Sequence, residues 1–379
     1  WIGVGRSEDS DDHAAGRDAA VAALEGRDPS LVVIFSSPER DLGAVGAGAR
    51  AVVGLGTRVV GCSTAGEIAG PVAAGGGVVA VGFGRGLMIR TALGDLADGP
   101  LAAGAAAAAG VVELDSPHRV LMLITEGLAG DRLAVLRGAY GVAGAAVPLV
   151  GGCAGDDFAM RQTWQLYDDQ VLSGGVIGVA IGSDAPIGVG MGHGFRRIGE
   201  PMVVTRSRTD RVISLDDRPA LDVYLDHMGA PAEAYEREGF LESVAMRHAL
   251  GLERAGGEEL RAVLGGDYQE RSLTAADIPE GSMLWVMAGD PESVVAGTEI
   301  ACEDALGRLE GRSPIGIVAF DCAGRRIILG ESGMRDEMAV IAARAPGVPL
   351  GGFYTYGEIA RVRGSRGVHS ATLVLLAFS

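Results

Sequence analysis

Three long apolar runs recur along the chain and predict buried strands. They cover residues 31–35, 120–124 and 315–320, and they are rich in β-branched side chains. A strand whose successive positions are all apolar is typically covered on both faces. Each run is followed by roughly 25–30 residues with helical periodicity, which is the length of a parallel βαβ crossover. A shorter apolar run then leads into a glycine-rich turn.

The glycine-rich turns share a sequence motif that indicates an internal repeat. Residues 61–68 (GCSTAGEI) and 352–359 (GFYTYGEI) have the common frame G-x-x-T-x-G-E-I, and residues 152–156 (GCAGD) form a shorter relative. Further strand-like runs follow at residues 77–83, 175–181 and 372–378. We therefore predict an α/β fold of two domains, with duplicated β-α-β-(Gly turn)-β units and mixed sheets. Chance matches from the high Gly and Ala content are the alternative.

A domain boundary is predicted near residue 214. A strand-like run at residues 201–206 leads into Asp216, Asp217 and Pro219. Either aspartate could cap a helix with the proline in its first turn. Residues 220–228 and 232–250 then have helical periodicity. We expect domains at residues 1–213 and 214–379.

Composition narrows the function classes. The net charge is −17, and all 32 basic residues are Arg. An acidic chain repels phosphate backbones and anionic membrane surfaces, so we expect neither as a partner. No segment has the ~20 apolar residues of a bilayer span, and no secretory signal is visible. The four cysteines form no CxxC pair, which favours reduced thiols and a cytoplasmic location.

The motifs resemble the two portions of the FIST family. The N-terminal portion is matched by residues 31–37, 59–68, 150–157 and 164–174. The C-terminal portion is matched by residues 319–331, 348–359 and 367–378, and residues 214–225 resemble the joint. The resemblance implies an intracellular signal-transduction sensory domain that binds a small ligand, with amino acids or their derivatives proposed. It also implies that some relatives are haem-bearing nitric-oxide sensors.

The glycine turns supply candidate ligand-binding residues. Backbone N–H groups at such turns bind anions, and a neighbouring carboxylate accepts from an ammonium group. Glu67, with Thr64 in the same motif, and Glu358 would flank this position, and Asp156 stands at the corresponding place in the middle copy. A purely structural role, in which these side chains cap their own turns, is the alternative.

Other candidates lie in the C-terminal motif. Arg325 follows a predicted strand and could hold a carboxylate in a bidentate fork, or pair with Glu331 or Glu358 instead. Tyr354 and Tyr356 could line a pocket, or be ordinary core aromatics. A nucleophilic pair of Cys322 and His369, with Glu358 as the orienting group, is a further alternative, although buried cysteines are more often inert.

Metal and haem sites have weak sequence support. No HExxH or CxxC is present, and no two of the six histidines are spaced i, i+4, so we predict no metal site. Haem needs one axial histidine in an apolar pocket, and His193 and His227 are the candidates. We therefore predict a sensor for a small polar metabolite, without a cofactor. Ligand identity, signalling partner and oligomeric state stay open. A haem sensor or a Cys-dependent enzyme are the alternatives.

Overall fold

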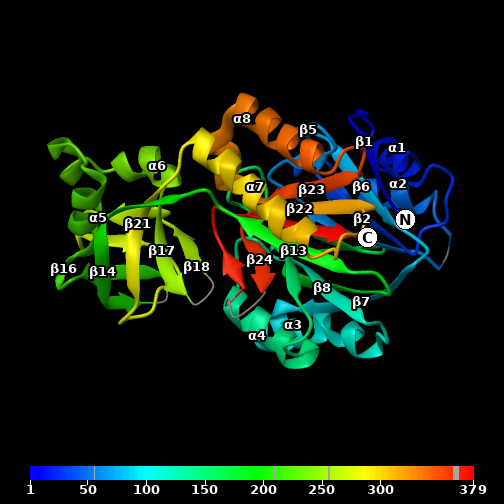
Figure 1. Ribbon diagram of the computed structural model, residues 1–379, viewed down its shortest axis with the longest axis horizontal. Coiled ribbons are helices and arrows are strands. Elements are labelled where there is room, and N and C mark those ends of the chain that lie inside the picture. The colour runs from blue at the N-terminus through cyan, green and yellow to red at the C-terminus, as the bar shows by residue number, and fades with distance from the viewer. Residues whose placement is uncertain (55, 209, 255–256, 362–366) are drawn as a thin grey trace.

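The fold consists of a three-sheet core and one inserted sheet (Figure 1). The computed structural model describes residues 1–54, 56–208, 210–254, 257–361 and 367–379. The core contains three units of the same plan, and the segment 193–290, here called the inserted segment, interrupts the third unit. It projects to one side of the core, in green to yellow in Figure 1. The predicted α/β class with repeated β-α-β units and mixed sheets is confirmed.

Each core unit follows the order β-α-β-α-β, then a short hairpin, then a final strand. Unit 1 contains β1 (Ile2–Ser7), α1 (Asp12–Leu24), β2 (Leu31–Ser36), α2 (Leu42–Arg50), β3 (Arg58–Ser63), β4 (Glu67–Ala69), β5 (Val72–Ala74) and β6 (Val78–Phe83). Unit 2 contains β7 (Leu87–Asp95), α3 (Pro100–Ala107), β8 (His118–Thr125), α4 (Arg132–Ala143), β9 (Leu149–Cys153), β10 (Gln165–Tyr167), β11 (Gln170–Leu172) and β12 (Gly175–Ser183). Unit 3 contains β13 (Ile187–Gly192), α7 (Pro291–Gly307), β22 (Gly316–Cys322), α8 (Ala323–Arg344), β23 (Leu350–Thr355), β24 (Glu358–Arg361), β25 (Val368–His369) and β26 (Leu373–Phe378).

The units exchange their hairpins in a cycle. The sheets have the orders β1-β6-β2-β3-β10-β11, β7-β12-β8-β9-β24-β25 and β13-β26-β22-β23-β4-β5. The hairpin of unit 1 therefore completes the sheet of unit 3, that of unit 3 completes the sheet of unit 2, and that of unit 2 completes the sheet of unit 1. Within each sheet the two strands of the crossover are parallel, as the spacing predicts. The exchange ties the three units into one body with pseudo-threefold symmetry.

Burial on both faces explains the continuous apolar runs. In β2, Leu31, Val33 and Phe35 face the central cluster shared by the three sheets. Val32 and Ile34 face the outer cluster under α1 and α2. The pair α3 and α4 covers the second sheet, and α7 and α8 cover the third. Strand side chains alternate between faces, so each run must be apolar at every position.

The inserted segment forms a sheet of its own with a separate apolar core. Its strands have the order β18-β17-β21-β14-β15-β20-β19, and β16 pairs with β15. Their bounds are β14 (Arg196–Arg208), β15 (Arg211–Leu215), β16 (Arg218–Pro219), β17 (His248–Arg254), β18 (Gly257–Ala262), β19 (Gly265–Asp267), β20 (Ser272–Thr274) and β21 (Met283–Ala288). Two helices, α5 (Ala220–Met228) and α6 (Phe240–Val244), accompany them. No helix among the described residues has the length and apolar character to cross a bilayer.

Two local expectations for this segment are wrong. Residues 232–250 do not form one helix, because short helical turns around α6 end at Arg247 and β17 begins at His248. Gly239, with a φ of +87°, sits between these turns and breaks the helix. Asp216 and Asp217 do not cap α5 either. They occupy the left-handed positions of the tight β15–β16 turn, and Pro219 is the N-cap residue.

Candidate functional site

The three glycine turns meet at the centre of the core, here called the hub. In each turn a backbone N–H donates across to the strand that precedes another turn. These equivalent hydrogen bonds run from Ala65 N to Tyr354 O (2.9 Å), from Gly155 N to Ser63 O (2.9 Å) and from Tyr356 N to Cys153 O (3.3 Å). One N–H of each turn thus joins two units, and the N–H groups of Gly66 and Gly357 donate to the threonine of their own turn. The repeated motif therefore has a structural role, because it holds the three units of the pseudo-threefold core together.

The first hairpin residue of each unit carries a buried carboxyl or amide side chain in the same position. Its oxygen accepts a hydrogen bond from the backbone just before or at the start of the last strand. The three bonds run from Gly77 N to Glu67 Oε2 (3.0 Å), from Gly175 N to Gln165 Oε1 (2.8 Å) and from Thr372 N to Glu358 Oε2 (3.1 Å). The equivalent of Glu67 and Glu358 in the middle unit is therefore Gln165. The expectation that Asp156 holds this place is wrong.

Burial is the main influence on the pKa values of the two glutamates at the hub, Glu67 and Glu358. Burial raises the pKa of Glu67 to about 7, against the hydrogen bonds from Thr64 Oγ1 (2.5 Å) and Gly77. Burial raises the pKa of Glu358 to about 8, and the Thr372 amide, the Cys322 side chain and the charges of Arg325 and Arg132 oppose this rise only in part. Glu358 is fully buried, and its Oε1 has no hydrogen-bond partner among the described residues. Glu358 is therefore largely protonated at neutral pH.

Asp156 organises a loop that has no counterpart in the other two units. Its carboxylate accepts from the N–H groups of residues 160–162 and from the hydroxyl of Tyr356 (2.6 Å). Burial alone would raise the pKa of Asp156, but these hydrogen bonds hold it below its ordinary value. The loop spans residues 156–163 and contains three non-glycine residues with positive φ, Asp157, Phe158 and Met160. Asp156 and Tyr356 thus hold a strained loop in place.

Arg325 is fully buried and has no donor left for a ligand. An arginine side chain has five N–H donors, and here each has an acceptor. Nε donates to Asp321 (2.7 Å), Nη1 to His193 O and Val294 O, and Nη2 to Thr298 Oγ1 and to Glu337. Its ion-pair partners are Asp321 and Glu337. The expected alternative partners, Glu331 and Glu358, are not the ones that it contacts.

Tyr354 is enclosed in the interior, and Cys322 is half-buried. Tyr354 is fully buried, and its ring lies beside the guanidinium of Arg326 (5.9 Å). Burial raises the pKa of the Cys322 thiol well above its ordinary value, so the side chain stays protonated near neutral pH. A nucleophilic cysteine needs the thiolate form. Among the described residues no group of three or more His, Cys, Asp or Glu is placed to hold a metal ion.

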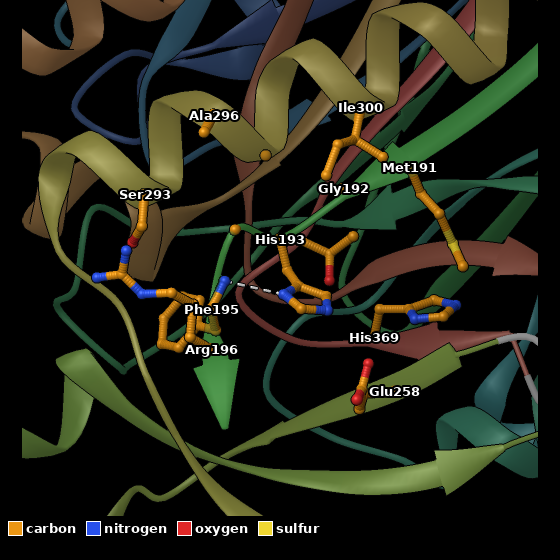
Figure 2. Close-up of a pocket in the computed structure, with 13 residues that line it drawn as sticks. Met191, Gly192, His193, Phe195, Arg196, Glu258, Ser293, Ala296, Ile300 and His369 are labelled. Carbon is orange, nitrogen blue, oxygen red and sulfur yellow. Dashed lines mark hydrogen bonds between the residues drawn. The ribbon is translucent and has the colours of Figure 1, made fainter. Parts of the chain in front are cut away.

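A cavity of about 400 Å³ lies where the inserted segment joins the core, and we call it the junction pocket. Its walls come from the end of β13, from one face of α7, from the β25 region and from β18 (Figure 2). Met191, Phe195 and Ile300 supply apolar surface, and His193 and Glu258 supply polar groups. Its volume lies within the usual range of small-molecule sites. Of the predicted site residues, His369 lines this pocket.

His193 is fixed as a hydrogen-bond donor toward the pocket. The backbone N–H of Phe195 donates to His193 Nδ1 (2.9 Å), as the dashed line in Figure 2 shows. The hydrogen of the neutral ring must therefore be on Nε2. Burial lowers the pKa of His193 to about 4, although the charge of Glu258 opposes this shift. The ring is thus neutral at physiological pH and keeps one N–H.

His369 is oriented by a bond away from the pocket. Its Nε2 lies 2.9 Å from the carbonyl oxygen of Ala360, which can only accept, so Nε2 carries the hydrogen and Nδ1 keeps its lone pair. Burial lowers the pKa of His369 as well. Glu258, on β18, brings a carboxylate from the inserted segment, and Arg197 Nε donates to its Oε1 (2.5 Å). The pocket therefore combines a fixed donor, a carboxylate and an apolar wall.

The pocket residues do not fit an axial haem ligand at His193. Iron ligation through Nε2 would require the hydrogen of the neutral ring on Nδ1. The N–H of Phe195 already points at Nδ1, so two donors would face each other. His227, the other candidate, lies on α5 in the inserted segment, and its Nδ1 is buried beside Gly199.

Sequence reasoning missed the residues that make the pocket polar. Glu258 and Arg196 carry no motif, and they reach the pocket only because the inserted segment folds back against α7 and β25. The sequence indicates His193 only as a candidate axial ligand of haem. The one available signal was its setting in Gly192-His193-Gly194, since both glycines pack against α7 without room for a side chain.

A FIST N domain model matches residues 30–218, and a FIST C domain model matches residues 220–361. The two matches confirm the resemblance seen in the motifs. Their limit falls in the β15–β16 region of the inserted segment, whose sheet contains strands from both sides.

The curated relatives are proteins without an assigned activity. An uncharacterized protein of Mycobacterium tuberculosis is 27% identical over 236 residues, which are 61% of this chain and 60% of that protein. An uncharacterized protein of Mycobacterium bovis is 26% identical over 235 residues, with the same coverage. The chain thus matches less than two thirds of the length of these relatives. Among solved structures, the match to T. maritima PurL complexed with ATP covers 99% of this chain and 71% of the PurL chain. The sequence identity is 10% and the TM-score is 0.21.

Proposed function

The chain belongs to the FIST family of signal-transduction sensory domains, and from that premise we propose that it senses a small polar metabolite, an amino acid or a close relative, in the junction pocket. The observation that supports this most is the pairing of a fixed donor with a carboxylate in one cavity. His193 Nε2–H comes from the core and Glu258 from the inserted segment. The hub, where the shared motifs lie, is occupied by hydrogen bonds between the units.

The pocket chemistry suits a zwitterion with a short apolar side chain. The N–H of His193 would donate to the carboxylate of the ligand, and Glu258 would accept from its ammonium group. Met191, Phe195 and Ile300 would cover the apolar part. Because the pKa of His193 is about 4, this donor is unchanged from about pH 5 to 8, and ligand affinity should not fall across that range through this residue.

A binding screen tests the proposal. The purified protein is mixed separately with each proteinogenic L-amino acid and with simple amines and carboxylates, and the shift in its unfolding temperature is measured. Compounds that raise this temperature are then titrated by calorimetry to obtain Kd. A ligand at ~100 times its Kd adds about 2.7 kcal/mol to the free energy of unfolding. His193→Leu should weaken binding by about 10- to 150-fold, since a hydrogen bond to a charged group is worth about 1.5–3 kcal/mol. His118→Leu, outside the pocket, is the matched control.

Two results would contradict the proposal. One is the absence of binding by every compound in the screen. The other is a His193→Leu variant that binds as tightly as the wild type.

We further propose a cytoplasmic location, since the four cysteines are all free thiols. The output would pass to a signalling protein rather than to nucleic acid or membrane, because the chain has a net charge of −17.

A further inference from the structure

We infer that occupation of the junction pocket is transmitted to the inserted sheet through Glu258, Arg197 and Trp285. This inference rests on the proposed function and adds the route by which a bound ligand changes the protein. The three side chains form a line from the pocket into the inserted segment. Arg197 Nε donates to Glu258 Oε1 (2.5 Å), and the Arg197 guanidinium lies 3.7 Å from the centre of the Trp285 ring.

The carboxylate of Glu258 has two possible cationic partners, the ligand and Arg197. It lines the pocket, where it would accept from the cationic group of a ligand, and it already pairs with Arg197. A second cation beside the carboxylate competes for its oxygens and weakens the hold on Arg197. Arg197 does not line the pocket, so it responds to the ligand only through Glu258.

The pair is placed where a small shift affects the contact between the inserted segment and the core. Trp285 belongs to the apolar cluster that joins the two parts, together with Phe195 and Met287 from the inserted segment and Leu329 from α8. Strand β18 carries Glu258 and also Arg261, whose Nη1 donates across the junction to Val368 O (3.0 Å). Movement of Glu258 therefore pulls on the same strand that is hydrogen-bonded to the core.

The two chains that connect the inserted segment to the core each contain a glycine that packs closely against its neighbours. The first connection contains Gly194, with a φ of +76°, and the second contains Gly289, which packs against Phe195. Arg197 is thus a positioning residue, which couples the pocket to the inserted sheet and does not itself hold the ligand.

Trp285 fluorescence tests this route. In a Trp1→Phe/Trp164→Phe background, Trp285 is the remaining tryptophan. The compounds of the amino-acid screen are titrated while binding is measured by calorimetry. We expect a bound compound to shift the emission of Trp285. We expect Arg197→Met to remove that shift while the compound still binds, with a Kd no weaker than that of the wild type, because Glu258 then has no competing cation. Arg208→Met, an exposed arginine on the same strand, is the matched control and should keep the shift.

The outcomes separate the two proposals. Binding without any change in Trp285 emission overturns the transmission route and leaves the sensor proposal standing. A shift that persists in Arg197→Met also overturns it. Absence of binding by every compound contradicts the sensor function, and the transmission route falls with it.

Discussion

Replacing Glu358 by Gln should stabilise the protein increasingly as the pH rises. The side chain is fully buried, one carboxyl oxygen accepts from Thr372 N, and the other has no partner among the described residues. A neutral side chain meets the demands of this site without the cost of burying a charge. The middle unit already has this arrangement, because Gln165 accepts from Gly175 N at 2.8 Å in the equivalent position.

The magnitude follows from proton linkage. The pKa of Glu358 is about 8 in the folded protein, against 4.5 for an exposed glutamate. Below the lower value both states hold the proton, and the stability does not depend on this group. Between the two values the unfolded chain releases the proton and the folded protein keeps it. The free energy of unfolding therefore falls by about 1.4 kcal/mol per pH unit, and by about 5 kcal/mol in total once the pH exceeds 8.

Urea unfolding of wild type and Glu358→Gln at several pH values from about 5 to 9 measures this effect. The stability of the variant relative to the wild type should rise by about 4 kcal/mol over that range. Glu238→Gln, at an exposed position, is the control and should follow the wild-type curve. If the curves of wild type and Glu358→Gln stay parallel, or if the variant loses stability as the pH rises, Glu358 is not a protonated buried acid.

Two further substitutions probe the interior. Arg325→Met should destabilise the protein by about 3–5 kcal/mol in urea unfolding, because it leaves Asp321 and Glu337 buried without their shared cation; a loss below about 1 kcal/mol would mean that the carboxyls protonate at little cost. Gln165→Glu places a carboxyl beside the buried Glu126 and should destabilise the protein more at alkaline than at acidic pH; an equal loss at both would instead indicate a packing defect.

The local elements could be predicted from the sequence, because each depends on near neighbours. The apolar runs at residues 31–35, 120–124 and 315–320 became β2, β8 and β22, and the glycine motifs became the turns after β3, β9 and β23. The exchange of hairpins could not be predicted in this way. β4 pairs with β23, about 280 residues later in the chain, and such pairing leaves no periodic signal at either strand.

The candidate residues were chosen for their chemistry, and their burial could not be seen from the sequence. Arg325 and Glu358 are both residue types that bind ligands at surfaces, but here both are fully enclosed. The motif repeats for a structural reason, since each copy occupies the same contact in the hub. The error at Asp156 has a physical origin too. Residues 156–163 are inserted in the middle turn, and they displace the equivalent position to Gln165.

The junction pocket depends on a departure from the symmetry of the core. In unit 1, residues 8–11 connect β1 to α1, and in unit 2, residues 96–99 connect β7 to α3. In unit 3 the corresponding connection is the whole inserted segment, which reaches the same place between β13 and α7. The short connections lead directly from strand to helix in the first two units, whereas in the third unit the end of β13 lies beside a separate folded sheet. Gly192 and Gly297 of the core and Gly194 of the inserted segment all line the junction pocket, so a ligand in this pocket contacts both parts. A ligand that contacts both parts can bias their relative position, and a ligand that contacts only one part cannot.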